Sequence, residues 1–235
     1  MDLSVIVPTY NESKNIENTL VKIEEYFKKE KINGEIIVVD DASCDDTAEK
    51  VRKLTRREKN IFLTEMEKNY YKGWPVKIGM LKAVGNYIMY TDADLSTPIE
   101  EAKKLKKAID SGADIAIGSR VHEGGIDLRK SQPLYRQVLG KIFSNLKNFL
   151  ISDIADSQCG FKMYKKDAAK KLFEKQRIKN IIFEVEILYL AKKLNYKVVQ
   201  VPVEWKHSKE TRMRVSVGNA VNTLSSLIKI WFWHH

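Results

Sequence analysis

The chain has 235 residues, of which 43% are hydrophobic, enough for one large α/β domain. Its formal net charge of +10 indicates an anionic partner: nucleic acid, a phosphorylated substrate or an acidic membrane surface. Cys44 and Cys159 lie far apart in the sequence, with no Cys-x-x-Cys pair and no nearby histidine cluster, so neither a zinc site nor a disulfide framework is indicated. We find no signal-peptide pattern and no apolar run of the roughly 20 residues that a bilayer span needs. We therefore expect a cytoplasmic protein, soluble or peripheral to a membrane.

The first half of the chain alternates between short apolar runs and helical patterns. The apolar runs predict strands at residues 3–7, 36–39, 61–63, 87–90 and 114–118, of which 3–7 and 87–90 are expected to be buried. The intervening helical spacing is clearest in Ile16, Leu20, Ile23 and Phe27. A short helix is expected to follow residues 73–75, and another should carry Leu105 and Ile109. This alternation predicts βαβ units, a mostly parallel Rossmann-like sheet and helices on both of its faces.

The second half is richer in basic residues, including Arg120, Arg129, Lys130, Arg136 and Lys141. Its periodicity predicts helices near residues 133–151, 168–173 and 183–194, and a strand over residues 198–203. The last segment, residues 217–233, predicts an amphipathic helix that ends in Ile-Lys-Ile-Trp-Phe-Trp. Aromatic residues beside basic ones suit either a protein core or a membrane interface.

Three predicted strands end in acidic or polar residues, which are Tyr10 and Glu12, Asp40 and Asp41, and Asp92 and Asp94. The carboxyl ends of parallel strands share one edge of the sheet, where open α/β sheets bind ligands. Residues two apart share a face of an extended backbone, so Asp92 and Asp94 can converge on one cation. Mg²⁺ or Mn²⁺ shared with substrate phosphates suits one or two carboxylates. The alternative for an isolated Asp-x-Asp is a solvated acidic turn.

The residues after this pair, Thr97, Pro98 and Glu100, predict the N-cap, N1 and N3 positions of a helix. Ser43 and Asp46 predict a similar N-cap and N3 pair. Neither Gly-x-Gly-x-x-Gly nor a Walker lysine loop is present, which excludes a dinucleotide-binding fingerprint and a P-loop.

The segments SVIVPTYNE (residues 4–12), VVDDAS (38–43) and DAD (92–94) resemble the inverting family 2 nucleotide-sugar glycosyltransferases. Within that family, DLSTP (94–98), GSR (118–120) and DSQCGFK (156–162) are similar to polyprenyl-phosphate, or dolichyl-phosphate, glucosyltransferases, with dolichyl-phosphate mannose synthases as close relatives. The resemblance runs from Ser4 to about Arg214. It implies a glycosyltransferase-A fold in a single catalytic domain over residues 1–235. Residues 1–118 would bind the nucleotide sugar, and residues 119–235 would bind the acceptor and carry a membrane-facing C-terminal segment.

The resemblance also implies roles for single residues. The nucleotide base and ribose would be held by Pro8, Tyr10, Glu12, Val39 and Asp41. Asp92 and Ala93 would contact the nucleotide sugar, and Asp94 would ligate Mg²⁺ or Mn²⁺, helped by Ser96 where the mannose synthases carry glutamine. Arg120 and Arg136 would receive the lipid phosphate. Separately from the resemblance, Lys162 is a candidate to close over the diphosphate, and the alternative is an ordinary surface lysine. One departure from the family is a bulky Trp74-Pro75 after Lys72-Gly73, where glycine and alanine are usual.

Asp156 lies where relatives that transfer to hydroxyl groups place their general base, so base function and sugar-hydroxyl contact remain alternatives. A hydroxyl acceptor would need such a base, whereas a phosphate monoester has a second pKa of about 6 and is largely dianionic at pH 7. Arginines are well suited to bring a phosphate dianion towards a diphosphate. The alternative for Arg120 is an ordinary surface ion pair.

The leading expectation is therefore transfer of glucose from UDP-glucose to a polyprenyl phosphate, at the cytoplasmic face of a membrane. Alternatives are mannosyl transfer from GDP-mannose and transfer to a glycan or protein hydroxyl. A nucleic-acid-binding protein is disfavoured, because no helix-turn-helix, RNP-like or zinc motif accompanies the positive charge. Eukaryotic relatives carry membrane helices that this sequence lacks, and a membrane-protein partner is a further expectation.

Overall fold

The computed structural model describes the chain except residues 122–126, 129–142, 144, 207–216 and 235. Arg136, Arg129, Lys130 and Lys141 lie outside the described residues, as does most of the helix expected at 133–151. In the described part, seven strands form one sheet in the order β3-β2-β1-β4-β6-β5-β7. These strands are β1 (Leu3–Thr9), β2 (Gly34–Asp40), β3 (Ile61–Glu65), β4 (Tyr87–Thr91), β5 (Ile115–Ser119), β6 (Phe161–Lys165) and β7 (Val198–Pro202).

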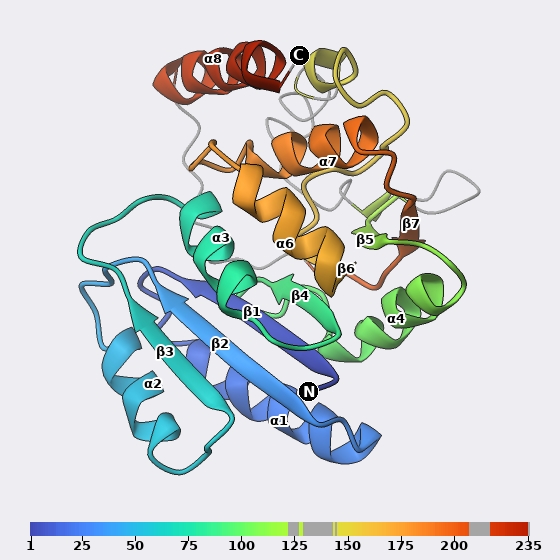
Figure 1. Ribbon diagram of the computed structural model, residues 1–235. Coiled ribbons are helices and arrows are strands. Elements are labelled where there is room, and N and C mark those ends of the chain that lie inside the picture. The colour runs from blue at the N-terminus through green and yellow to red at the C-terminus, as the bar shows by residue number, and fades with distance from the viewer. Residues whose placement is uncertain (122–126, 129–142, 144, 207–216, 235) are drawn as a thin grey trace.

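The first four strands in chain order are parallel, as predicted. β1 lies between β2 and β4 and pairs with both, and β2 also pairs with β3. The register places Pro8 opposite Val39 and Thr9 opposite Asp40. The loops that follow β1, β2, β3 and β4 therefore leave from one carboxyl edge of the sheet (Figure 1).

β6 is antiparallel to both of its neighbours, β4 and β5, and was not predicted. Its sequence, FKMYK, contains two lysines in five residues, which is unusual for a buried central strand. Lys162 pairs with Tyr90, and Phe161 pairs with Thr91. The segment before β6 is thereby brought to the carboxyl end of β4, beside Asp92.

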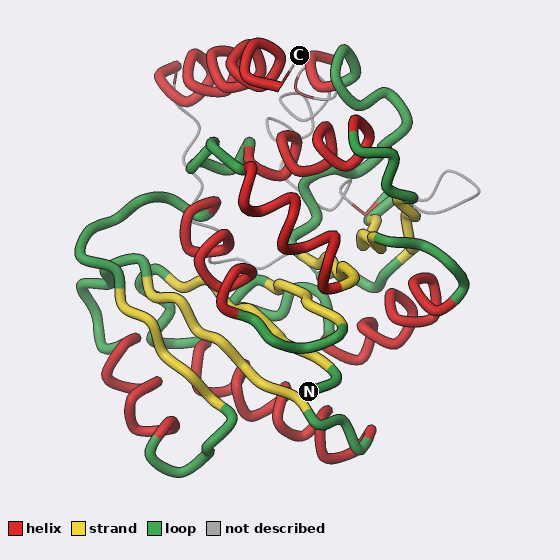
Figure 2. Tube along the Cα trace, in the orientation of Figure 1, coloured by secondary structure: helices red, strands yellow, loops and turns green. Residues whose placement is uncertain are grey.

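Helices cover both faces of the sheet, as the alternation predicts (Figure 2). Their bounds are α1 (Ile16–Glu30), α2 (Thr47–Thr55), α3 (Gly73–Lys82), α4 (Ala102–Asp110), α6 (Lys166–Lys175), α7 (Phe183–Lys193) and α8 (Val217–His234). One core joins α1, α2 and α4 to the face that carries Val5, Val7 and Met89. The other joins α3, α6, α7 and α8 to the face that carries Ile6, Ile88 and Tyr90. Side chains of neighbouring residues in a strand therefore pack into different cores, because successive side chains of a pleated strand point to opposite faces of the sheet.

α8 lies beyond α7, on the side away from the sheet (Figure 1). Leu227 and Ile230 are buried and belong to the core that includes α7. The exposed part of α8 carries apolar side chains, Leu224, Ile228 and Phe232, beside the exposed Asn222 and Lys229. In the part of the chain that the structure describes, no helix combines the length and the apolar character needed to cross a membrane.

Both predicted N-caps are wrong. Thr97 is buried and Pro98 is extended, with φ −57° and ψ 142°, so the helical turn begins only at Ile99 as a 3-10 helix, Ile99–Glu101, that leads into α4. α2 begins at Thr47, after Asp46, because Ser43 hydrogen-bonds to Asp40 and holds the preceding loop away from helical geometry. The loop before α2 is thus shaped by the contact between Ser43 and Asp40 at the sheet edge.

Candidate active site

Four loops at the carboxyl edge of the sheet contain a non-glycine residue in the left-handed region. These residues are Asn11 (φ 55°), Ala42 (φ 60°), Tyr71 (φ 66°) and Leu95 (φ 45°), which follow β1, β2, β3 and β4 respectively. Each such conformation costs on the order of 1–3 kcal/mol and persists only where surrounding contacts impose it. Strain of this kind clusters at functional sites, and here it clusters along one edge.

Asp40 and Asp41 play different parts at the end of β2. Asp40 accepts hydrogen bonds from the Thr9 hydroxyl at 3.0 Å and from the Ser43 amide at 2.9 Å, and so ties β1 to the β2 loop. Asp41 accepts the amide of Tyr70 at 2.7 Å and ties that loop to the segment after β3. Burial raises the pKa of Asp41, although hydrogen bonds from the Tyr70 and Tyr71 amides partly oppose the effect.

The other residues expected around the nucleotide are of two kinds. Tyr10 is exposed beyond the end of β1, and Glu12, which accepts a hydrogen bond from Asn15 at 2.8 Å, is partly exposed in the same loop. Pro8 and Val39 are buried and paired across the two strands, with the Val39 side chain in the core. Tyr10, Glu12 and Asp41 are thus brought to one edge, whereas Pro8 and Val39 form its floor.

The DAD segment is a turn rather than an extended strand end, because β4 ends at Thr91 and the Leu95 amide donates to the Asp92 carbonyl oxygen at 3.1 Å. Ala93 is buried, and its carbonyl oxygen accepts the Thr19 hydroxyl of α1 at 2.6 Å. Asp92 and Asp94 are both partly exposed, and their carboxylates contact different partners, Lys72 and Ser96 respectively. Asp94 accepts the Ser96 amide at 2.9 Å on one oxygen and the Ser96 hydroxyl at 2.9 Å on the other. The left-handed Leu95 makes this tight turn possible.

Asp94 and Ser96 fit a divalent ion that is shared with a ligand. Among the described residues, no group of three or more His, Cys, Asp or Glu side chains could hold a metal ion by itself. Mg²⁺ sites of the shared type use one or two carboxylates and complete their coordination with substrate phosphates and water. Asp94 supplies the carboxylate, and the Ser96 hydroxyl, which donates to Asp94, keeps acceptor lone pairs for an ion.

Asp92 is held from two sides by residues that the sequence did not single out. Lys72, at the start of α3, contacts Asp92 Oδ1 with its Nζ at 2.7 Å. Gly160 lies so close that a Cβ atom there would be 2.2 Å from Asp92 Oδ2. Gly160 belongs to the DSQCGFK segment, so the absence of a side chain at this position was visible in the sequence. Its reason becomes clear only from the approach of β6 to β4.

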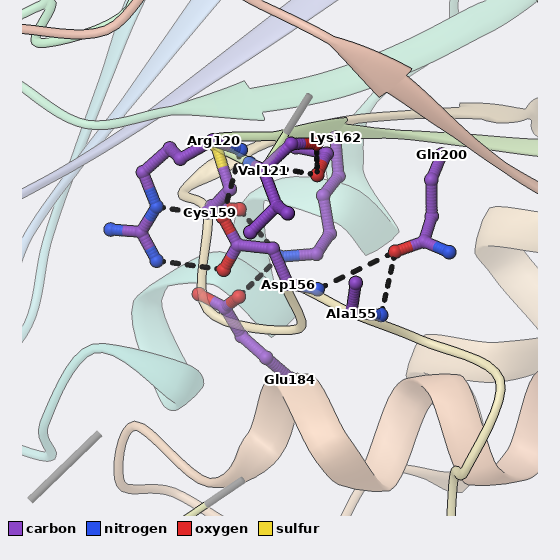
Figure 3. A network of polar contacts seen from close by, with 9 residues as sticks. Arg120, Val121, Ala155, Asp156, Cys159, Lys162, Glu184 and Gln200 are labelled. Atoms are coloured by element: carbon purple, nitrogen blue, oxygen red, sulfur yellow. Dashed lines mark hydrogen bonds and ion pairs between the residues drawn. The ribbon is translucent and has the colours of Figure 1, made fainter. Parts of the chain in front are cut away.

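Lys162 does not lie over the edge as expected. It is fully buried and forms an ion pair with Glu184, and its Nζ also donates to the Cys159 carbonyl oxygen at 2.5 Å (Figure 3). The reason is its register in β6, which turns its side chain into the core beside the Tyr90 ring. Contact between Lys162 and a donor diphosphate would require opening of this core, whereas Lys72 reaches the edge and contacts Asp92 there.

Arg120 and Asp156 form a two-pronged ion pair (Figure 3). Arg120 Nε and Nη2 donate to the two Asp156 oxygens at 2.7 and 2.8 Å, and the Arg120 amide adds a third bond at 3.0 Å. The side chains are only 12% and 2% exposed, so this is not an ordinary surface pair. Burial would lower the pKa of Arg120, but Asp156 outweighs it and raises that pKa. Trp205 lies against the guanidinium, 5.3 Å from ring centroid to Cζ.

The described site residues thus fall into two adjoining groups, the acidic edge around Asp94 and the Arg120–Asp156 pair. Cys159 and Gly160 lie between them in the segment before β6. Burial, with a smaller effect of Asp156, raises the pKa of the Cys159 thiol to about 12. A neutral thiol is neither a nucleophile nor a good metal ligand, so Cys159 acts through packing. Arg136, the second arginine expected at the acceptor phosphate, is outside the described residues.

Comparison with curated proteins gives a consistent set of relatives. A dolichyl-phosphate beta-glucosyltransferase of Trichomonas vaginalis is 36% identical over 222 residues, covering 90% of this chain and 66% of that protein. A dolichyl-phosphate beta-glucosyltransferase of Dictyostelium discoideum is 34% identical over 215 residues, covering 86% of this chain and 66% of that protein. The chain thus spans about two thirds of the length of these relatives.

Solved structures confirm the glycosyltransferase-A fold. TarS of S. aureus, solved with UDP-GlcNAc, superposes with a TM-score of 0.63 at 22% identity, covering 98% of this chain and 66% of that one. The mannosyltransferase PcManGT of Pyrobaculum calidifontis, solved with GDP-Man and Mn²⁺, gives 0.58 at 21% identity, covering 85% and 54%. Residues 4–173 match the family described as glycosyl transferase family 2, and this span covers all the strands but β7. The chain belongs to glycosyl transferase family 2.

Proposed function

We propose that this chain transfers glucose from UDP-glucose to a polyprenyl phosphate of the dolichyl type, with inversion at the sugar. Its curated relatives bear the name dolichyl-phosphate beta-glucosyltransferase. The observation that carries the acceptor class is the Arg120–Asp156 pair, because both oxygens of Asp156 are already bound by one guanidinium. A phosphate acceptor needs no base at this position, whereas a hydroxyl acceptor does.

The donor would lie along the carboxyl edge. Tyr10, Glu12 and Asp41 would bind the nucleoside, above the floor made by Pro8 and Val39. Asp92, with the Ala93 backbone, would bind the sugar. A Mg²⁺ or Mn²⁺ ion held by Asp94 and Ser96 would offset the charge that develops on the leaving diphosphate. The serine at position 96, where mannose synthases carry glutamine, favours glucose over mannose.

The acceptor phosphate would approach from the Arg120 side, which adjoins the edge through the segment before β6. Two of the guanidinium nitrogens bind Asp156, and the remaining N–H groups of Arg120 face the ligand in this proposal. Arg136 would add a second cation. An oxygen of the phosphate dianion forms the bond to the anomeric carbon while the bond to the diphosphate breaks, and UDP leaves with the electron pair.

A lipid acceptor requires contact with a membrane, and α8 is the element suited to it. Leu224, Ile228, Trp231 and Phe232 recur at helical spacing and are all exposed, while Leu227 and Ile230 attach the helix to the core. We place this face at the headgroup boundary of the cytoplasmic leaflet, where the net charge of +10 favours anionic lipid. A membrane-protein partner on the same face is the alternative. Cosedimentation with pure lipid vesicles, lost on Trp231→Ser/Phe232→Ser, supports lipid itself.

A donor screen tests the proposal. The protein is incubated in detergent with Mn²⁺, a polyprenyl phosphate and radiolabelled UDP-glucose, GDP-mannose or UDP-GlcNAc, and label is followed into the lipid phase. We expect label from UDP-glucose, lost with EDTA and with Asp94→Asn. If only GDP-mannose gives labelled lipid, the transferred sugar is mannose and the assignment of glucose is wrong. Label that stays in water-soluble product with every donor would refute the lipid-phosphate acceptor.

A further inference from the structure

A line of four alternating charges runs from the core to the carboxyl edge. It begins at Lys162, which is ion-paired with Glu184. Glu184 lies 3.5 Å from Lys72, and Lys72 lies 2.7 Å from Asp92. Side-chain exposure rises along the line, from 0% at Lys162 and 3% at Glu184 to 28% at Lys72 and 42% at Asp92. Only its outer half can meet a ligand.

The inner half of this line is fixed. A buried charge without a partner is strongly unfavourable, so Lys162 and Glu184 hold each other in place. Lys162 is fixed further by the Cys159 carbonyl oxygen at 2.5 Å and by the Tyr90 ring at 5.5 Å. Glu184, in the first turn of α7, therefore presents its other oxygen, Oε1, to Lys72 from a rigid position.

The backbone around Lys72 is also fixed. The amide of the next residue, Gly73, donates to the Lys179 carbonyl oxygen at 2.7 Å, and a Cβ at Gly73 would lie 2.6 Å from that oxygen. The residue before it, Tyr71, is left-handed with φ 66°. The start of α3 is thus packed against the segment leading into α7, and the Lys72 side chain extends from it to Asp92.

We infer that Lys72 binds the diphosphate of the nucleotide-sugar donor and that Glu184 is the positioning residue that aims it. An ammonium group has three N–H donors, and Asp92 and Glu184 account for two. The donor diphosphate competes with Asp92 for Lys72, and Asp92 is then released towards the sugar. Lys72 stays on Glu184 and faces the oxygen that gains charge as UDP leaves. This inference rests on the proposed donor class.

Calorimetric titration of UDP with Mn²⁺, beside the kinetics of transfer, tests the inference. We expect Lys72→Met to weaken UDP binding by about tenfold or more, the scale of one lost charge-assisted hydrogen bond. The KM for polyprenyl phosphate should stay unchanged, and Lys72→Arg should recover part of the loss. The control is Lys106→Met, since Lys106 forms an equally short 2.7 Å pair with Asp110 in the last turns of α4. That variant should bind UDP as the wild type does.

Glu184 needs a variant that still folds. Glu184→Gln leaves Lys162 buried without an anion, so the double variant Lys162→Met/Glu184→Gln is measured beside it. We expect the double variant to fold and to bind UDP about as weakly as Lys72→Met, and addition of Lys72→Met to it should weaken binding little further. Independent, additive losses would overturn the role of Glu184.

Unchanged UDP affinity in Lys72→Met would overturn the role of Lys72. UDP binding and lipid product of the wild-type protein distinguish this outcome from failure of the proposed function. If it binds UDP but gives no lipid product, the acceptor proposal fails and the variants still decide the roles of Lys72 and Glu184. If it does not bind UDP, the donor class fails and the inference fails with it.

Discussion

Replacement of Gly160 by alanine puts a methyl group where the Asp92 carboxylate lies. The added Cβ would be 2.2 Å from Asp92 Oδ2 and 2.5 Å from its Cγ, whereas ordinary contact begins near 3.4 Å. The carboxylate must therefore move by about 1 Å. The carboxylate is the far end of the Asp92 side chain, which is partly exposed, so it can move without disturbing the core. The perturbation is local to the candidate donor site.

The expected magnitude follows from that displacement. A misplacement of about 1 Å in a reacting group costs roughly 100-fold in rate, or about 2.7 kcal/mol in the activation barrier. The stability cost should be small, because the Asp92–Lys72 pair is partly exposed and such pairs contribute about 0–1 kcal/mol. We expect Gly160→Ala to lose roughly 100-fold in kcat while its Tm falls by only a few degrees.

The assay is transfer from UDP-glucose at saturating donor, with Tm measured on the same preparations. Gly79→Ala is the control, because a Cβ at Gly79 would lie 2.5 Å from Ile6 Cγ2 in the core. That variant should lose about 1–3 kcal/mol of stability through overpacking. Its kcat should equal that of the wild type when the assay temperature is well below its Tm. A wild-type kcat in Gly160→Ala would refute the placement of Asp92, and loss of folding would make Gly160 structural.

Three further outcomes are expected. Asp94→Asn should abolish the rise in Tm that Mn²⁺ and UDP give the wild type, and a rise of equal size would refute the ion site. At pH 8, dithionitrobenzoate should modify exposed Cys44 quickly and Cys159 only after denaturation, because burial raises the pKa of Cys159 to about 12; fast reaction of both thiols would contradict its burial. Burial also raises the pKa of Asp41 above its unfolded value of about 3.9, so its ionisation destabilises the fold as pH rises from about 4 through the raised pKa. We expect the free energy of unfolding of Asp41→Asn, measured by urea denaturation and taken relative to the wild type, to be higher at pH 7 than at pH 4. A difference between the two proteins that does not change with pH would contradict this.

The parallel half of the fold was predictable because its signals are local. Each strand there contains a short continuous apolar run, and α1 buries the expected Ile16, Leu20, Ile23 and Phe27. Acids directly after a parallel strand must lie at the carboxyl edge, so Asp92 and Asp94 could be placed from the sequence. Motif resemblance added the family and the fold, which the comparisons confirm.

The remainder depends on contacts between segments far apart in sequence. β6 escapes prediction because Lys162 interrupts its apolar pattern, and the partner that makes burial of this lysine acceptable, Glu184, is 22 residues away. The Arg120–Asp156 pair spans 36 residues and is likewise invisible in either segment alone. Burial of a charge is decided by such partners, so the sequence alone points to Lys162 for the donor diphosphate and gives no signal for Lys72.

The most direct test of the central claim compares polyprenyl phosphate with the matching free polyprenol, in one detergent, with UDP-glucose and Mn²⁺. The two acceptors differ only in the phosphate, which is the group that Arg120 and Arg136 would bind and that removes the need for a base. The account predicts glucosylated lipid from the phosphate and none from the alcohol. Equal transfer to the alcohol, or release of glucose into water alone, would contradict it and would make Asp156 the candidate base.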